Sequence, residues 1–218
     1  MLPGVSDEAV RKVLIKNITS GLYTRLRSGG GHTDVDRKRW IWELIQNAKD
    51  SIVGDSQRKC VDIFCEIESD SVRFVHDGSP FTEDAQLGLI CKFSEGKDNK
   101  ESTGQFGTGF MTTHCLSTVI DVKSDIVASD GNLTGFSMTI YRDGVSREDL
   151  KKGVEKTFES VRTIDPPGKT EFCYPLKSEL NRRAGRLGAQ SFYDNIIETM
   201  IFCPTINSAV LIYEKLPF

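Results

Sequence analysis

One ten-residue stretch, residues 42–51 (WELIQNAKDS), constrains the fold and the chemistry of this chain more than any other. In an α-helix, which turns by about 100° per residue, Glu43, Asn47 and Asp50 fall within an arc of about 60°. The opposite side is apolar and consists of Ile41, Ile45, Ala48 and Ile52. The stretch therefore predicts an amphipathic helix that presents an acid, an amide and a second acid in a row. Most surface helices have a solvated polar face, so the helix alone does not define a site.

Two later segments carry residues whose chemistry complements this polar row. The first follows an apolar, strand-like run. The second is rich in glycine, which lets backbone N–H groups and the start of a helix approach an anion. The second segment is not a P-loop, because no Gly-Lys-Ser/Thr follows its glycines. The first segment reads His76, Asp77, Gly78, Ser79, Pro80, Phe81 and Thr82, and the second reads Gly104, Gln105, Phe106, Gly107, Thr108, Gly109 and Phe110.

In this order, the motifs Glu-x-x-x-Asn-x-x-Asp, Asp-Gly-x-Pro and Gly-x-x-Gly-x-Gly resemble those of the GHKL ATPase superfamily. Its members include type II topoisomerases, the ninety-kilodalton heat-shock chaperones, histidine kinases, MutL, MORC and sacsin. The runs ELIQNAKDS and GQFGTGF are most similar to the chaperone and sacsin branch. The resemblance covers roughly residues 30 to 175 and implies the Bergerat ATP-binding fold, a two-layer α+β sandwich.

The resemblance implies a Mg²⁺-dependent ATPase with ATP and Mg²⁺ as cofactors. Glu43 matches the general base that takes a proton from the attacking water. Asn47 matches the amide whose oxygen holds Mg²⁺, an ion that takes few protein ligands beside phosphates. Asp50 would hold an ordered water or order the adenine end of the site. Residues 104–110 match the phosphate cradle, and Thr170 matches a late threonine near the adenine pocket.

The segment after the first strands departs from the family pattern Asp-x-Gly-x-Gly, whose Asp accepts a hydrogen bond from the adenine amino group. Aligning Gly78 with the first glycine places His76 at the Asp position and Pro80 at the second glycine. Aligning Asp77 with the Asp requires a shift of one residue. A carboxylate only accepts and suits an amino group, whereas a neutral imidazole accepts through one nitrogen in one tautomer. This chemistry favours Asp77, although strand alternation leaves either face open. The residues expected to contact the nucleotide here are His76, Asp77, Gly78, Pro80 and Phe81.

The composition is that of a soluble globular protein. The chain has 218 residues, of which 38% are hydrophobic and 27% charged, and its net charge is −3. This balance does not indicate nucleic-acid binding, and no apolar run approaches the roughly 18 residues of a transmembrane helix. The six cysteines are scattered and form no C-x-x-C pair, which is typical of buried thiols in a reducing compartment. We therefore expect a cytoplasmic protein that makes no membrane contact.

The periodicity of the chain predicts helices packed on one face of a mixed, mostly antiparallel sheet, which is an α+β architecture. We expect an N-terminal helical segment at residues 1–30 and one ATPase domain at 31–218. The expected helices span residues 6–27, 34–54, 81–92, 107–116, 146–161 and 179–202, and the expected strands 60–67, 71–76, 118–124, 133–142, 170–176 and 208–214. The apolar stripe expected in the first helix consists of Val10, Val13, Leu14, Ile18, Leu22 and Leu26.

Several local expectations accompany these elements. Asp34 or Asp36 should cap the second helix, and Gly54 should lie at its exit. The last helix could break near Gly185 or Gly188. Residues 93–103 (FSEGKDNKEST) are polar and lie between two site motifs, which is where functional lids occur.

The sequence supports an ATP-driven conformational switch and leaves two alternatives. A phosphotransferase like the histidine kinases would carry Asn where this chain has Glu43. A nucleotide-sensing module without significant turnover would not need a general base. Partners would be ATP and ADP, further domains of the same polypeptide, because this chain would form the N-terminal part of a larger protein, and a nucleotide-dependent second copy. In the related families an N-terminal segment straps across the partner subunit; the alternative is a helix packed on its own domain.

Overall fold

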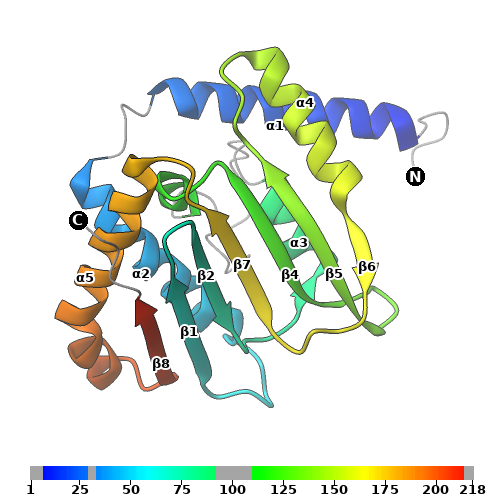
Figure 1. Ribbon diagram of the computed structural model, residues 1–218. Coiled ribbons are helices and arrows are strands. Elements are labelled where there is room, and N and C mark those ends of the chain that lie inside the picture. The colour runs from blue at the N-terminus through cyan, green and yellow to red at the C-terminus, as the bar shows by residue number, and fades with distance from the viewer. Residues whose placement is uncertain (1–6, 29–32, 92–109, 214–218) are drawn as a thin grey trace.

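A computed structural model describes residues 7–28, 33–91 and 110–213 of the chain. An open sheet of eight strands forms one layer, and helices pack against it (Figure 1). This confirms the expected α+β architecture. The helices are α1 (Asp7–Ser28), α2 (Asp34–Ser51), α3 (Glu83–Cys91), the 3₁₀ helix η1 (Phe110–Cys115), α4 (Arg147–Ser160) and α5 (Glu179–Phe202). The strands are β1 (Val61–Ile67), β2 (Ser71–His76), β3 (Phe81–Thr82), β4 (Val119–Val127), β5 (Leu133–Tyr141), β6 (Arg162–Ile164), β7 (Thr170–Pro175) and β8 (Ile206–Tyr213).

The sheet is mixed and mostly antiparallel, as expected. Its strands lie in the order β6-β5-β4-β7-β2-β1-β8, and the short β3 pairs with β4. The pairs β1–β8 and β3–β4 are parallel, and the other pairs among the described strands are antiparallel. Strand β7 lies between β2 and β4, and its first residue, Thr170, is in register with His76 at the end of β2. The topology thus joins two sequence motifs that lie far apart in the chain.

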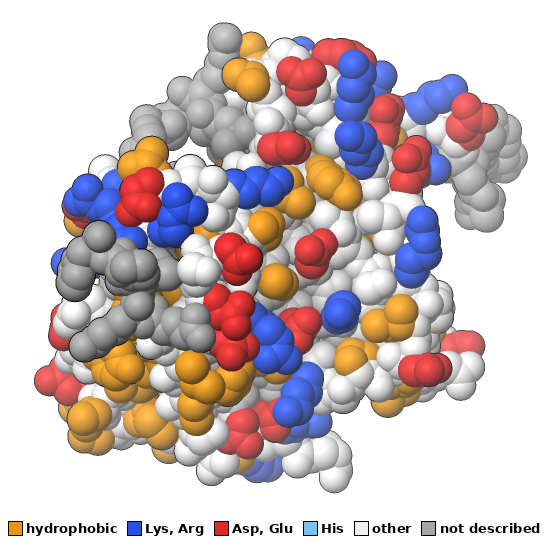
Figure 2. All heavy atoms as spheres, in the orientation of Figure 1, with side chains coloured by type: hydrophobic (Ala, Val, Ile, Leu, Met, Phe, Trp, Pro, Cys, Tyr) orange, Lys and Arg blue, Asp and Glu red, His pale blue; other side chains and the backbone are white. Residues whose placement is uncertain are grey.

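The sheet face turned toward the viewer carries interspersed acidic and basic side chains (Figure 2). On this face the Arg73 guanidinium donates a hydrogen bond to Glu171 at 2.7 Å, and Lys123 lies 4.0 Å from the same carboxylate. The Thr139 hydroxyl donates to Asp121 at 2.6 Å. Exposed ion pairs of this kind contribute little to stability and are typical of a solvated face. The buried polar groups that require an explanation lie on the opposite, helix-covered face.

The N-cap of helix α2 lies one residue before Asp34, the first of the two expected caps. Thr33 is the N-cap, its hydroxyl accepts the Asp36 N–H, and the Asp36 carboxylate accepts the Thr33 N–H, which completes a capping box. The expectation of Asp34 or Asp36 as the cap was therefore wrong, although Asp36 takes part in the motif. The helix ends at Ser51, and Gly54 follows in the exit turn with a φ of 86°.

Helices α2 and α5 pack closely through a tryptophan and a glycine. Trp40 on α2 is fully buried, and its indole N–H donates to the Ala184 carbonyl at 2.9 Å. A Cβ atom at Gly188 would overlap the Trp40 ring. Helix α5 runs unbroken through Gly185 and Gly188, so the expected break does not occur. Gly188 instead lets the two helices approach each other.

All six expected strands are present, and three local differences remain. Phe81 and Thr82 form the short strand β3 rather than the start of a helix, because they pair with the end of β4. Residues 110–115 form a 3₁₀ helix, and residues 107–109 lie outside the described part of the chain. Strand β6 was not expected, because its three residues carry no period-two pattern; it forms by pairing with β5.

Helix α1 packs on α4 of the same chain. This agrees with the alternative of a helix packed on its own domain. Arg147 on α4 donates to the Ser20 hydroxyl at 3.0 Å and lies 5.7 Å from the centre of the Tyr23 ring. The expected stripe was wrong at Val10 and Val13, which are 54% and 58% exposed. At this end of α1 it is Arg11 that contacts α4, because its guanidinium lies 5.8 Å from the centre of the Phe158 ring. Figure 1 shows α1 and α4 side by side. The buried stripe consists of Ile15, Ile18, Thr19 and Leu22. Across the described residues, no helix has both the length and the apolar character of a membrane span.

Candidate nucleotide-binding site

The polar side of α2 lies at the border between core and solvent. The side chain of Glu43 is 16% exposed, and Arg39, one turn earlier, donates a hydrogen bond to its Oε1 at 2.9 Å. The Asp50 carboxylate lies 3.6 Å from the ammonium group of Lys49. On the other side, the apolar stripe is buried as expected and consists of Ile41, Ile45, Ala48 and Ile52. Glu43, Asn47 and Asp50 are therefore partly shielded side chains on one helix face.

Asn47 carries a polar atom that the described residues do not satisfy. Its amide nitrogen Nδ2 is buried and has no hydrogen-bond partner among them. An unsatisfied buried polar group costs about 1–3 kcal/mol, so its presence in a native fold requires a reason. The amide oxygen of the same side chain is a suitable ligand for Mg²⁺, which is usually held by one or two protein oxygens plus phosphates and water. The described residues contain no group of three or more His, Cys, Asp and Glu that could hold a metal ion. The unsatisfied Nδ2 holds no metal ion itself, but it shows that the amide of Asn47 lacks a full set of partners among the described residues.

At the end of β2, the side chains of His76 and Asp77 point to opposite faces of the sheet. His76 is 4% exposed and lies on the same face as the buried Phe74, with 6.3 Å between the ring centres. Asp77 points to the other side: its Oδ1 accepts the Asp62 N–H at 2.7 Å, and its Oδ2 lies 3.4 Å from the Arg58 guanidinium. The carboxylate favoured on chemical grounds as the adenine acceptor is thus engaged with β1. The arrangement corresponds to the ungapped alignment, which puts His76 at the Asp position.

Gly78 lets this turn approach the last turn of α2. A Cβ atom at Gly78 would overlap the Ser51 hydroxyl and come within 2.8 Å of His76 Nδ1. The Ser51 hydroxyl is held by the Ala48 carbonyl at 2.7 Å, so it has little room to move. The Gly78 N–H donates to His76 Nδ1 at 3.1 Å. Glycine is therefore required here by close packing, and the His76 side chain accepts a hydrogen bond from its backbone N–H.

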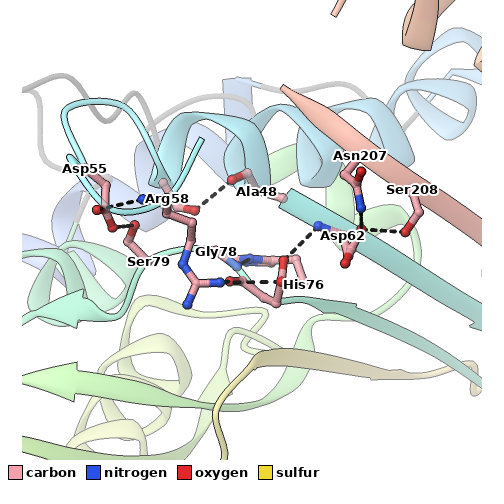
Figure 3. Close-up of polar contacts among 11 residues, drawn as sticks. Ala48, Asp55, Arg58, Asp62, His76, Gly78, Ser79, Asn207 and Ser208 are labelled. Carbon is pink, nitrogen blue, oxygen red and sulfur yellow. Dashed lines mark hydrogen bonds and ion pairs between the residues drawn. The ribbon is translucent and has the colours of Figure 1, made fainter. Parts of the chain in front are cut away.

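A network outside the expected motifs ties the loop after α2 to this turn (Figure 3). Asp55 Oδ1 accepts the backbone N–H groups of Gln57 and Arg58 at 2.8 and 3.1 Å, and its Oδ2 accepts the Ser79 hydroxyl at 2.6 Å. The hydrogen bond from Ser79, followed by those from the backbone, lowers the pKa of Asp55 below its usual value. The Arg58 guanidinium donates to the Asp77 carbonyl. These contacts fix the turn that carries His76 and Gly78 against the end of α2.

A row of buried polar side chains runs from β2 across β7 to β4. Thr170 is 1% exposed, is paired in register with His76, and lies 2.6 Å from the Ser124 hydroxyl, Oγ to Oγ. Burial of His76, together with the positive charge of Arg58, lowers its pKa to about 4, so the imidazole is neutral at pH 7. The row therefore presents an uncharged ring and two hydroxyl groups on the face that carries the end of α2.

The other residues expected to contact the nucleotide lie either in the hydrophobic core or outside the part of the chain that the structure describes. Phe81 is 7% exposed, and its ring lies edge-on to Phe136 with 5.6 Å between centres. Phe110 is 1% exposed and packs on Phe172 at 5.7 Å. Both rings are thus part of the hydrophobic core that supports the site. Pro80, which precedes Phe81, is half-buried. The expected phosphate cradle (Gly104, Gln105, Phe106, Gly107, Thr108 and Gly109) and the expected lid at 93–103 lie outside the described residues.

Sequence reasoning missed four residues of this region. Ser124 had a usable signal, because it follows the period-two positions of Ile120 and Val122, which are buried in β4. A serine in an otherwise apolar buried row indicates a polar partner on the same face. The other three, Ser51, Asp55 and Arg58, contact the β2 turn only because the chain folds back, and their local sequence gives no such signal.

Comparison of the chain with models of known protein families finds no match, and a search of the curated proteins finds no relative either. The resemblance to GHKL ATPases therefore depends on the sequence motifs alone.

Proposed function

We propose that this chain binds ATP together with Mg²⁺ and hydrolyses it, and that the nucleotide acts as a conformational switch. The observation that carries the proposal is the amide of Asn47, whose buried Nδ2 has no partner among the described residues, one helical turn after the largely shielded carboxylate of Glu43. The same helix ends at Ser51, against the Gly78 turn and the row of His76 and Thr170. An acid, a metal-binding amide and a buried polar row in this order match the chemistry of nucleotide hydrolysis.

Each side chain has a role that follows from its environment. Glu43 takes the proton of the attacking water as general base, a contribution of about 100- to 10,000-fold in rate. Asn47 would hold Mg²⁺ through its amide oxygen, and the ion would neutralise phosphate charge. His76 and Thr170 would orient the base, and the hydrogen bond from Ser79 to Asp55 holds the turn that follows His76 in place.

The switch itself requires that ATP bind one conformation better than another, since a ligand shifts an equilibrium only by its difference in affinity. Further domains of the same polypeptide, or a second copy of the chain, would respond to that shift.

One observation favours a second candidate, a nucleotide sensor without turnover. Arg39 donates to Glu43 at 2.9 Å, so the carboxylate has to leave this ion pair or use its other oxygen to take a proton. If the ion pair persists with nucleotide bound, the chain would bind ATP without hydrolysing it.

Calorimetric titration with Mg²⁺-ATP and measurement of phosphate release on the same preparations test both candidates. We expect Glu43→Gln to bind ATP with an affinity close to that of the parent and to release phosphate about 100- to 10,000-fold more slowly. Gln46→Ala is the matched control, because Gln46 lies on the exposed side of the same helix. Binding without release by the parent would identify a sensor, near-normal release by Glu43→Gln would remove Glu43 as the base, and no binding would refute the proposal.

A further inference from the structure

The hydrogen-bonding state of His76 is fixed by its neighbour. The Gly78 backbone N–H can only donate, and it lies 3.1 Å from Nδ1 of the imidazole, which must therefore accept. A neutral imidazole has one N–H, so its proton is on Nε2. The ring is 4% exposed, and burial with the nearby Arg58 charge holds its pKa at about 4, which keeps it neutral at physiological pH. His76 thus offers a donor, Nε2–H, where the related motif offers a carboxylate that only accepts.

No described neighbour of His76 supplies a carboxylate, which can only accept, in its place. Asp77, the nearest carboxylate in sequence, is turned to the other face and accepts the Asp62 N–H at 2.7 Å. Thr170 and Ser124 share one hydrogen bond at 2.6 Å, and their hydroxyl groups can donate or accept. No described residue accepts a hydrogen bond from His76 Nε2. Of the three side chains in the row, only His76 has a fixed hydrogen-bonding role, and it is a donor.

A donor at this position discriminates between purines at their six-position. Adenine carries an amino group there, which also donates, whereas hypoxanthine and guanine carry a carbonyl oxygen, which accepts. Placing an amino group against an imidazole N–H leaves both donors without a partner in a buried site, which costs binding free energy. We propose that this site, if it binds a nucleotide as proposed above, prefers 6-oxopurine triphosphates to ATP, with His76 as the residue that determines base specificity.

The test compares Mg²⁺-ITP with Mg²⁺-ATP by calorimetric titration of the parent protein. ITP differs from ATP in the base ring edge alone and lacks the additional amino group of GTP. We expect ITP to bind at least about tenfold more tightly than ATP, which corresponds to about 1.4 kcal/mol. His76→Asp replaces the donor by an acceptor at the same place and should reverse this preference. His76→Asn, whose amide can present either group, should reduce it.

The outcomes separate this inference from the proposed function. Tighter binding of ATP than of ITP by the parent protein overturns the role of His76 and leaves the ATPase proposal intact. Equal affinities in the parent also overturn it. Binding of neither nucleotide refutes the proposed function and the base preference together. The parent comparison decides even where a His76 variant fails to fold, and circular dichroism of each variant shows which of them are folded.

Discussion

At the scale of single residues, Asn47 should show that a side chain can be required for function and yet reduce stability. Its buried Nδ2 has no partner among the described residues, so Asn47→Ala removes an unsatisfied polar group. We expect thermal stability to stay equal or to rise by up to about 1 kcal/mol. Nucleotide affinity in the presence of Mg²⁺ should fall by about 10- to 100-fold, a typical loss when a metal site is disturbed.

Titrations of Asn47→Ala with and without Mg²⁺, together with a thermal melt, test this expectation. The variant should bind nucleotide equally well in both conditions, whereas the parent should bind more tightly with Mg²⁺. An unchanged dependence on Mg²⁺ in the variant would exclude Asn47 from the metal site.

Substitution of Asp77 tests whether this carboxylate, rather than His76, contacts the base. Its carboxylate accepts the Asp62 N–H and lies near Arg58, and its side chain is 33% exposed. Asp77→Asn keeps an oxygen for the Asp62 N–H and loses only a partly exposed ion pair, which contributes about 0–1 kcal/mol. We therefore expect nearly unchanged stability and an unchanged ratio of ATP to ITP affinity. If the substitution weakens ATP binding strongly, Asp77 is the base acceptor and the shifted alignment is correct.

At the scale of elements, the contact between α2 and α5 determines where the polar face of α2 lies. Trp40 is fully buried against Gly188, and a methyl group at Gly188 would overlap its ring. We expect Gly188→Ala to lower the free energy of unfolding by about 1–3 kcal/mol through overpacking. Gly185→Ala is the matched control, since its Cβ would lie 3.4 Å from the nearest atom, on Ile67, and alanine favours the helix by about 1 kcal/mol.

Urea denaturation of both glycine variants measures the difference. Gly188→Ala should also weaken nucleotide binding, because a displaced α2 carries Glu43 and Asn47 with it. Equal stabilities of the two variants would show that α5 can move away from Trp40 at no cost.

Elements with a strong period were predictable from the sequence, and elements defined by contacts were not. The alternation of Val61, Ile63 and Cys65 predicted β1, and all three side chains are buried. Strand β3 was interpreted as helix, because two residues are too few to show a period and pairing with β4 decides their conformation. The cap of α2 was misplaced by one residue for a similar reason: Thr33 and Asp36 act together, and either acidic residue nearby looked sufficient.

At the scale of the whole molecule, the arrangement of residues within one helix was predictable from the sequence, and their arrangement between elements was not. Spacing on one helix placed Glu43, Asn47 and Asp50 on a shared face. The choice between His76 and Asp77 could not be made from sequence, because it depends on which strand face α2 covers. The pairing of Thr170 with His76 and with Ser124 depends on the order of β2, β7 and β4, which strand patterns do not specify.

The stability of the whole fold should depend on pH in part through the buried imidazole of His76. The pKa of His76 is about 4 in the folded protein and about 6.5 in the unfolded chain. Between these values the unfolded state binds a proton that the folded state does not, so stability is complete above pH 6.5 and is lost as the pH falls toward 4. At pH 5 the loss amounts to about 2 kcal/mol.

Urea unfolding at several pH values between 4 and 7, for the parent and for His76→Gln, isolates this contribution. The glutamine variant cannot take up the proton, so its stability should change less across this range than that of the parent. Carboxylates such as Asp55 and Asp62, whose pKa values are lowered in the folded state, act in the same direction but mainly below pH 4. They are present in both proteins, so their effect cancels in the difference. Parallel curves would mean that His76 takes up its proton without unfolding the site, and the fixed tautomer on which the base preference depends would then be lost as well.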